Sequence, residues 1–243
     1  FIALATGYVA YRLHEQWGEM AFAVKVIVLL ALALTLYNFF FMVEGRSGWV
    51  AIAVLPVVVA YQRLGIKGSV LVGLAVVVAL FGLYFGSDFF NTRVNAVFIE
   101  VQQWIDGQAV AQDTSNGRRL SFWLHSIEAF VQAPWFGYGM GGFVAAVTPH
   151  AQAAGFTFEF NNPHNQYLLF AVQGGVVALL LYGVLIYSIL AKKTSQHPVL
   201  LLGFVLAYAL LNMLNSFHYD FAEGVFFVLG LAALAFQPSM HKG

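Results

Sequence analysis

Long apolar segments separated by short polar ones dominate the chain. A helix needs about 20 apolar residues to cross the hydrocarbon core of a bilayer, and six segments meet or approach this length. We expect membrane-spanning helices at residues 21–43, 48–64, 68–85, 167–190, 199–217 and 221–236. Residues 1–10 are also apolar, and we interpret them as the end of a seventh span. The pattern therefore predicts an all-α polytopic membrane protein.

One segment, residues 86–166, is too long to be a simple connection, and segments of this kind usually carry function. Apolar residues recur in it at helical spacing over residues 94–105 and again over 120–130, where Pro134 ends the pattern. We expect two amphipathic helices here, lying on the bilayer surface or capping the bundle. The chain is thus predicted to divide into membrane helices (1–85), a loop domain (86–166) and three C-terminal membrane helices (167–243).

Two motifs follow the second amphipathic helix. The turn at residues 137–142 satisfies G-x-G-x-x-G, but it follows a helix and a proline instead of a strand. We interpret it as a turn that allows close backbone approach, not as a dinucleotide site. Further on, Asn162-Pro163 matches a helix cap followed by the first helical residue. This would place His164 in the first turn of the span at 167–190, at the boundary between membrane and water.

Composition agrees with the membrane interpretation. Hydrophobic residues make up 60% of the 243, and only 22 are charged, with 11 basic and 11 acidic side chains cancelling. A soluble domain carries about a quarter charged residues, and a nucleic-acid-binding protein shows a basic face. Both classes are excluded, as is a disordered chain. There is no cysteine, and hence neither a disulfide nor a thiolate metal ligand.

Basic residues set the orientation, because they accumulate on the cytoplasmic side of a membrane. Seven of the eleven, including all five lysines, fall in one set of alternate loops, whereas nine of the eleven acids fall in the other. We therefore place the C-terminus in the cytoplasm and residues 86–166 in the periplasm.

Four arginines lie on the outer side against this bias: Arg46, Arg93, Arg118 and Arg119. A guanidinium presents a planar fork of donors that matches phosphate oxygens, so the set suggests recognition of a phosphate or diphosphate near the membrane. Arg46 could instead reach lipid headgroups or pair with Glu44, and Arg93 could be a solvated charge. Arg118 and Arg119 open a helix, where a cation is unfavourable unless a phosphate binds there.

Histidine supplies the candidate general base. His164 lies in a polar run, and histidine is the usual general base for a hydroxyl nucleophile, although a capping role is the commoner fate of a lone histidine. His218 and Asp220 form the turn between the last two spans, where we favour capping over support of a site. The histidine spacing matches no metal motif, so neither a metal nor another cofactor is expected.

Four motifs resemble the O-antigen ligase superfamily, in the same order. They are Gly45-Arg46-Ser47-Gly48, Arg119-x-x-x-Trp123, Pro134-Trp135-Phe136-Gly137-Tyr138-Gly139 and Asn162-Pro163-His164-Asn165-Gln166-Tyr167-Leu168, the last followed by Gln173-Gly174-Gly175. Residues 215–229 resemble the closing spans of the ligase branch. The similarity runs from about residue 20 to 236, whereas the family has about twice as many spans.

The resemblance implies a GT-C-like fold and an inverting, metal-independent glycosyltransferase of the bacterial inner membrane, with its site facing the periplasm. It would move a glycan from undecaprenyl diphosphate to a sugar hydroxyl of lipid A-core. By the same resemblance, Arg46 and Arg119 would bind the diphosphate and His164 would act on the acceptor; Arg93 is a further diphosphate candidate. Membrane lipids are expected partners and nucleic acids are not.

Two kinds of alternative stay open. O-antigen or exopolysaccharide polymerases and pilin oligosaccharyltransferases share the donor and differ in the acceptor, which nothing in the sequence identifies. A lipid or polysaccharide transporter would place ionisable residues near the middle of its spans. Here the charged residues gather at the outer boundary, which favours an enzyme.

Overall fold

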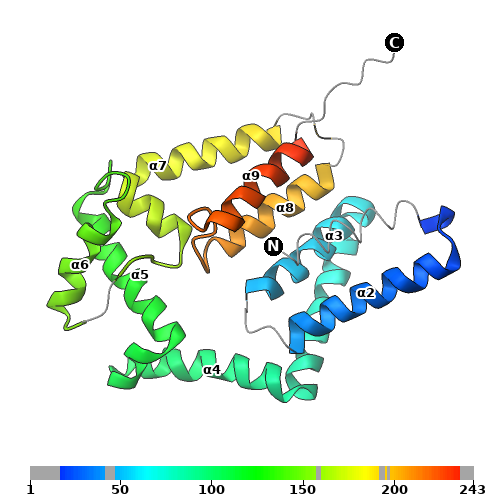
Figure 1. Cartoon of the computed structure of the whole chain (residues 1–243), viewed down its shortest axis with the longest axis horizontal. Helices are drawn as coiled ribbons and strands as arrows, with labels where there is room; N and C mark the ends of the chain where they lie inside the picture. The colour runs from blue at the N-terminus through cyan, green and yellow to red at the C-terminus, as the bar shows by residue number, and fades with distance from the viewer. Residues whose placement is uncertain (1–16, 42–46, 157–159, 192–194, 196–197, 236–243) are drawn as a thin grey trace, which may run out of the picture. The chain divides into compact units, whose positions relative to one another are not determined.

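The computed structural model describes residues 17–41, 47–156, 160–191, 195 and 198–235, and within these ranges it contains helices and turns but no strand (Figure 1). The expected all-α class is confirmed. The elements are η1 (Trp17–Glu19), α2 (Phe22–Phe41), α3 (Ser47–Gly86), α4 (Asp88–Ile105), η2 (Ala109–Asp113), α5 (Ser115–Gln132), α6 (Phe143–Ala153), α7 (Gln166–Ala191), α8 (Pro198–Leu211) and α9 (Phe221–Ala235).

The chain divides into two compact units. The first consists of Phe1–Arg93, Ser195–Tyr208 and Gly230–Gly243, and the second of Val94–Thr194 and Ala209–Leu229. The helices α4, α8 and α9 contribute residues to both units. The candidate base His164 and the arginine Arg119 belong to the second.

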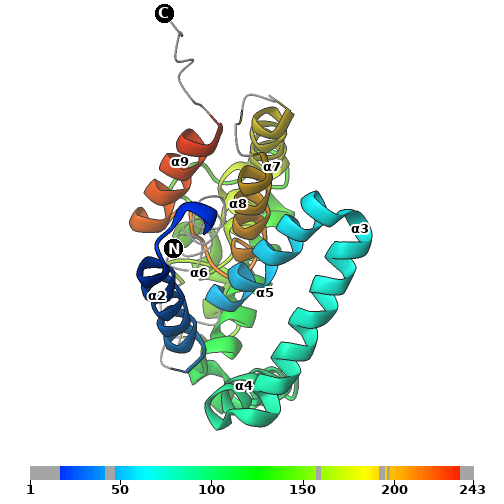
Figure 2. The same cartoon turned by 90° about the vertical axis from the view of Figure 1, so that its right-hand side faces the viewer.

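In the first unit, α3 joins two of the expected spans. Residues 48–64 and 68–85 are both helical, and the connection between them is a kink at Gly65, visible in Figure 2, where φ is +70° and ψ is −166°. A residue without a Cβ adopts this backbone conformation at little cost. The two expected helical segments are therefore present as two helices that meet at this kink, between Arg63 and Lys67.

Helices of the described part are apolar enough for a bilayer. Arg63–Gly86 and Gln166–Ala191 have the length and composition to cross one, and Phe22–Leu34, Pro198–Leu211 and Phe221–Ala235 are shorter apolar helices. On α3, large apolar side chains such as Leu71, Val78 and Phe85 are more than two-thirds exposed. Exposing this apolar surface to water costs about 25 cal/mol of free energy for each Å², whereas contact with lipid removes that cost.

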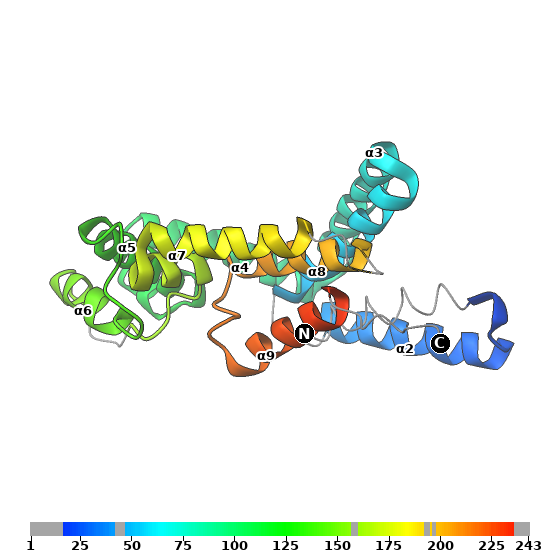
Figure 3. The same cartoon turned by 90° about the horizontal axis from the view of Figure 1, so that it is seen from above.

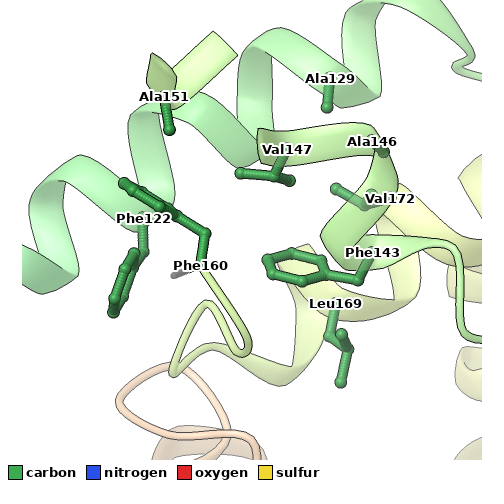
Figure 4. Packing of buried hydrophobic residues seen from close by; sticks show 9 residues of the cluster. All are labelled: Phe122, Ala129, Phe143, Ala146, Val147, Ala151, Phe160, Leu169 and Val172. Carbon is green, nitrogen blue, oxygen red and sulfur yellow. The ribbon is translucent and has the colours of Figure 1, made fainter. Parts of the chain in front are cut away.

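The second unit has its core where α5, α6 and the beginning of α7 pack together (Figure 3). Buried residues of α5 recur every three or four positions and form one face of the helix. Figure 4 shows the cluster they build with neighbouring elements: Phe122, Ala129, Phe143, Ala146, Val147, Ala151, Phe160, Leu169 and Val172. The two expected amphipathic helices are confirmed, because 94–105 lies within α4 and 120–130 within α5.

The helix α7 bends back on itself at Gly175, where φ is +63° and ψ is −161° (Figure 1). The ring centroids of Tyr167 and Tyr182 lie 6.2 Å apart and those of Phe170 and Tyr182 5.3 Å apart. In a straight helix, the 15 steps from Tyr167 to Tyr182 would span about 22 Å. The bend separates a buried first half from a second half whose apolar side chains, Leu180 and Leu181 among them, are exposed.

The glycine-rich turn fills this bend. Backbone N–H groups of Tyr138 and Gly139 donate to the carbonyl oxygens of Val172 and Gln173, both over 2.9 Å. In return, the N–H groups of Val176 and Val177 donate to Pro134 and Trp135, over 2.8 and 3.3 Å. A Cβ at Gly137 would meet the Val172 carbonyl oxygen, and one at Gly175 would meet that of Trp135. The expected close backbone approach at residues 137–142 is confirmed.

The end of α8 corrects one expectation. The span predicted for 199–217 ends at Leu211, six residues early, and a polar loop follows it. The reason lies in side chains that bond across the loop instead of facing lipid. Asn212 Nδ2 donates to His218 Nε2 over 3.0 Å, and Ser216 Oγ donates to Asn162 Oδ1 over 2.7 Å.

Candidate functional site

His164 lies just before α7, not within its first turn. The helix begins at Gln166, and Asn165 caps it, because Asn165 Oδ1 accepts the N–H groups of Tyr167 and Leu168 over 3.0 and 3.2 Å. The prediction that Asn162 and Pro163 start the helix is therefore wrong. Of the three asparagines in this run, the last, Asn165, lies at the right distance from the free N–H groups of the helix.

Asn162 instead holds the loop that carries His164. Its Oδ1 accepts the backbone N–H of His164 over 2.9 Å and the hydroxyl of Ser216 over 2.7 Å. The first contact supports a left-handed backbone at His164, where φ is +50°, which is uncommon for a residue with a side chain. Trp123 of α5 adds a third support by donating its Nε1–H to the Pro163 carbonyl over 2.9 Å.

The imidazole of His164 is held from one side. Nδ1 lies 2.8 Å from Asn215 Oδ1, and the ring lies 5.9 Å from that of Phe122 between centroids. Asn215 in turn donates its Nδ2–H to Asp220 Oδ2 over 3.1 Å. Within the described ranges no side chain or backbone group hydrogen-bonds Nε2, which leaves this nitrogen available for a proton of a bound hydroxyl.

Asp220 is partly buried beside these groups. Burial raises the pKa of Asp220, and the charge of Glu223 raises it further, whereas His164 and the hydrogen bond from Asn215 oppose the increase. The aspartate therefore lies within two hydrogen bonds of His164. The sequence favoured a capping role for this residue, and the structure places it next to the candidate base.

His218 occupies a different environment, although it is two residues away from Asp220. Its Nε2 accepts from Asn212 and lies 2.9 Å from the hydroxyl of Tyr182. Burial lowers the pKa of His218 from 6.5 to about 4, so the ring is neutral at physiological pH. Its backbone N–H and that of Tyr219 both donate to Oε1 of the buried Gln166. These contacts agree with the structural role that the sequence favoured.

Arg119 is half-buried on α5, in the same unit as His164. Residues three and four positions apart lie on one face of a helix, so Arg119 shares its face with Phe122 and Trp123, which both contact the His164 segment. The neighbouring Arg118 contacts η2 instead. Its side chain donates to the carbonyl oxygen of Gln112 over 2.9 Å and lies 3.4 Å from Asp113.

The N-terminus of α5 already has an anion. The carboxylate of Glu100 accepts both the backbone N–H and the side-chain amide of Asn116, over 2.9 and 2.8 Å, and Thr114 caps Gly117 N. A carboxylate at this position stabilises the helix dipole. Any phosphate bound by Arg119 would therefore meet the side of the helix and not its end.

The other two predicted diphosphate residues, Arg93 and Arg46, are not among the described residues of the second unit. Arg93 belongs to the first unit, and its guanidinium lies 5.4 Å from the ring centroid of Phe89, one turn away on α4. Arg46 falls outside the described residues. The structure thus joins only His164 and Arg119 of the four predicted site residues in one unit.

No group of three or more His, Asp or Glu side chains suited to a metal occurs in the described part of the chain. The nearest arrangement is Glu128, whose Oε2 lies 2.8 Å from His125 Nδ1 and 3.7 Å from His150 Nδ1. His125 is buried between Phe156 and Phe160. These contacts place one carboxylate beside two imidazole rings at the edge of the core.

A groove of about 620 Å³ opens beside the site, between the second half of α7 and the start of α9. Apolar side chains line most of it, with Phe170, Leu185 and Val228 among them. His218 and Asp220 provide polar groups on its wall. The hydrogen-bonded chain from His164 through Asn215 therefore ends at an apolar groove of the same unit.

A known protein family matches most of the chain. The family profile described as O-antigen ligase matches residues 27–183, well over half of the chain. The chain belongs to the O-antigen ligase family. The matched range includes Arg119, His164 and the paired segments of the α7 bend. The resemblance seen in the sequence is therefore confirmed.

A curated relative adds a second comparison. An uncharacterized protein of Haemophilus influenzae is 28% identical over 193 residues, which cover 74% of this chain and 46% of the relative. The chain thus spans about half the length of the relative it matches. No solved structure matches the chain.

O-antigen ligase family proteins are integral to the membrane and act as glycosyltransferases in lipopolysaccharide or polysaccharide synthesis. The apolar helices of this chain agree with that location.

Two contributors to the site were missed in the sequence: Asn215, which meets the His164 ring, and Gln166, which holds the opposite loop. The signal available for both was a polar residue at the boundary of an apolar stretch.

Proposed function

We propose that this O-antigen ligase family protein transfers a glycan from undecaprenyl diphosphate to a sugar hydroxyl of lipid A-core, with His164 as general base. The observation that carries the proposal is the His164 ring, which is bonded through Nδ1 and has Nε2 available. The segment that carries it contacts Phe122 and Trp123, which follow Arg119 by about one turn of α5. A base and a phosphate-binding cation on one site are what glycosyl transfer from a diphosphate requires.

The proposed reaction is a single displacement. The acceptor hydroxyl oxygen attacks the anomeric carbon and forms the new glycosidic bond, while its proton passes to Nε2 of His164. The bond from that carbon to the diphosphate oxygen breaks, and the lipid diphosphate leaves with the electron pair. Attack opposite the leaving group inverts the anomeric configuration, so His164 and the arginines would lie on opposite sides of the reacting sugar.

Arg119 would neutralise the charge that develops on the leaving diphosphate, and Arg46 and Arg93 are further candidates for the same role. A guanidinium binds two phosphate oxygens at once and stays charged at every relevant pH. With such cations in place, the chemistry needs no divalent metal. The site would face the periplasm of a bacterial inner membrane, where both lipid-linked substrates are exposed.

The test is transfer by the purified full-length protein. Undecaprenyl-diphosphate-linked glycan is incubated with lipid A-core, with a second glycan chain or with pilin, and the acceptor that gains mass is identified. We expect lipid A-core to gain the glycan, with transfer persisting in EDTA. Mass gain on the glycan or the pilin would assign the polymerase or oligosaccharyltransferase activity instead. Movement of lipid between leaflets without any mass gain would indicate a transporter.

His164→Ala tests the base directly. Loss of a general base lowers the rate by about 10² to 10⁴, whereas donor binding should survive, because the diphosphate contacts belong to other residues. His150→Ala is a matched control, since His150 lies in the same unit and contacts Glu128 instead of the site. Loss of donor binding in His164→Ala would move this residue to the diphosphate site.

A further inference from the structure

Three side chains form a continuous hydrogen-bonded chain behind the candidate base. His164 Nδ1 lies 2.8 Å from Asn215 Oδ1, and Asn215 Nδ2 lies 3.1 Å from Asp220 Oδ2. The histidine comes from the segment before α7, and the other two come from the loop between α8 and α9, about 50 positions later. The loop thus reaches the ring from the side away from Nε2.

With Asp220 ionised, the donors and acceptors in this chain have one arrangement. An ionised carboxylate accepts hydrogen bonds and donates none, so the NH₂ group of Asn215 must face Asp220. The amide oxygen of Asn215 then faces Nδ1, and because this oxygen only accepts, Nδ1 must carry the hydrogen. A neutral imidazole has one N–H, which leaves a lone pair on Nε2.

From this geometry we infer that Asn215 is a positioning residue that makes Nε2 of His164 the proton-accepting nitrogen, with Asp220 fixing the direction of the Asn215 amide. The inference rests on the proposed function, in which His164 acts as the base. The amide would hold the ring toward the acceptor hydroxyl and select the reactive tautomer before the substrate arrives. Asp220 would also oppose the positive charge that the ring gains with the proton.

Closure of the loop does not require Asn215. Ser216 bonds to Asn162, and the backbone N–H groups of His218 and Tyr219 bond to Gln166, so three other contacts join the same two segments. Asn215 is distinguished from them by its partner, which is the imidazole ring. The apolar ring of Phe122 is a further neighbour of the imidazole. Among the described residues, Asp220 is the acid whose charge interacts with that of His164, and the charge of Glu223 interacts with that of Asp220.

The first test reads the tautomer without any turnover. Nitrogen-15 spectra of the full-length protein in detergent distinguish protonated from bare imidazole nitrogens, and the His164 signals are those absent from His164→Ala. We expect Nδ1 protonated and Nε2 bare in the neutral ring. Asn215→Ala should move the hydrogen to Nε2, whereas Ser216→Ala, which removes a neighbouring contact of the same loop, should leave it on Nδ1. A wild-type ring protonated on Nε2 would overturn the inference.

The second test exchanges the two groups. Asn215→Ala should lower kcat about 10- to 100-fold, the usual effect of losing a group that orients a reactive histidine, with KM for the donor unchanged. The double variant Asn215→Asp, Asp220→Asn keeps an acceptor on Nδ1 and should recover activity. A carboxylate now touches the ring and favours its charged form, so the acidic limb of the kcat profile should move to higher pH.

The outcomes separate the two proposals. If the wild-type protein transfers glycan and Asn215→Ala does so at the same rate, the positioning role is refuted and the proposed function stands. If the wild-type protein transfers nothing to any acceptor, the proposed function fails, and the nitrogen-15 spectra still decide whether Asn215 sets the tautomer.

Discussion

Two histidines near the candidate site have opposite surroundings, and at the residue scale this difference separates chemistry from structure. His164 has one ring nitrogen bonded to Asn215 and the other open, whereas Nε2 of His218 meets Asn212 and Tyr182 in the wall of a groove. A ring with a free nitrogen can exchange protons with a ligand. A ring whose nitrogen is already an acceptor inside the fold holds the loop instead.

The pKa of His218 predicts a pH dependence of stability. Because burial lowers this pKa from 6.5 to about 4, the unfolded chain binds a proton in a range where the folded chain does not. The contribution of His218 is fully present above pH 6.5 and is lost as the pH falls toward 4. His218→Gln keeps an acceptor but does not titrate.

We therefore expect the Tm in detergent to fall less steeply between about pH 7 and 4.5 in His218→Gln than in wild type. Equal slopes for His218→Gln and wild type would show that His218 titrates normally in the folded protein.

Arg119 gives a second prediction at this scale. Replacing it with Lys keeps the charge and removes the two-pronged donor geometry. Transfer should fall about 10- to 100-fold, as expected when one hydrogen bond to a charged group is lost, with the main effect on donor binding. Arg118→Lys is a matched control, because Arg118 faces Gln112 and Asp113. Normal transfer by Arg119→Lys would show that Arg119 serves only membrane topology or structure and does not bind the diphosphate.

Residue type made His164 and the four outer arginines candidates, and the family resemblance then selected His164 and Arg119 together with Arg46. Asn215 was not assigned a role, since an asparagine at the end of an apolar stretch has no pattern of its own. Its importance depends on meeting a residue 51 positions away. Contacts of this range are set by packing, which local spacing does not encode.

At the scale of elements, the bend of α7 divides the helix into two halves with different surroundings. Its first half packs in the core of the second unit, and only its second half exposes apolar side chains. The four backbone groups released at the bend are satisfied by residues 134–139. Unpaired backbone groups away from water cost several kcal/mol each, so the turn and the bend depend on each other.

Substitutions at the bend should therefore destabilise the protein. Gly175→Ala and Gly137→Ala each place a Cβ against a backbone carbonyl at a positive φ. We expect a loss of about 1–3 kcal/mol for each, measured as a lower Tm in detergent. Gly183→Ala is the control, because a Cβ there meets nothing within 4 Å on the same helix. If all three variants melted like wild type, the bend would contribute little to stability.

Element boundaries show what the apolar pattern can and cannot predict. Residues 48–64 and 68–85 were correctly expected to be helical, because both are long and uniformly apolar. The pattern does not distinguish a straight span from α7, since the residues on both sides of Gly175 are apolar. The end of α8 at Leu211 was missed for a related reason: Asn212, Asn215 and Ser216 were counted as tolerated polar residues within a span.

At the scale of the whole molecule, family membership and charge distribution point the same way. The O-antigen ligase family is membrane-integral, and the described helices include two that are long and apolar enough to cross a bilayer. Proposed sidedness comes from the lysines, which all fall in one set of alternate loops. The site described around His164 lies on segments assigned to the opposite side.

Cysteine labelling tests that sidedness, and the chain is well suited to it because it contains no native cysteine. Gln112 lies in η2 within the segment proposed to be periplasmic, and Ser195 lies between α7 and α8, next to two lysines. In intact cells, a membrane-impermeant maleimide should label Gln112→Cys and leave Ser195→Cys unmodified until the membrane is permeabilised. Both variants must retain glycan transfer, so that the labelling reports the native topology. Labelling of both from the same side would contradict the orientation, and with it the placement of His164 where lipid-linked donor and acceptor meet.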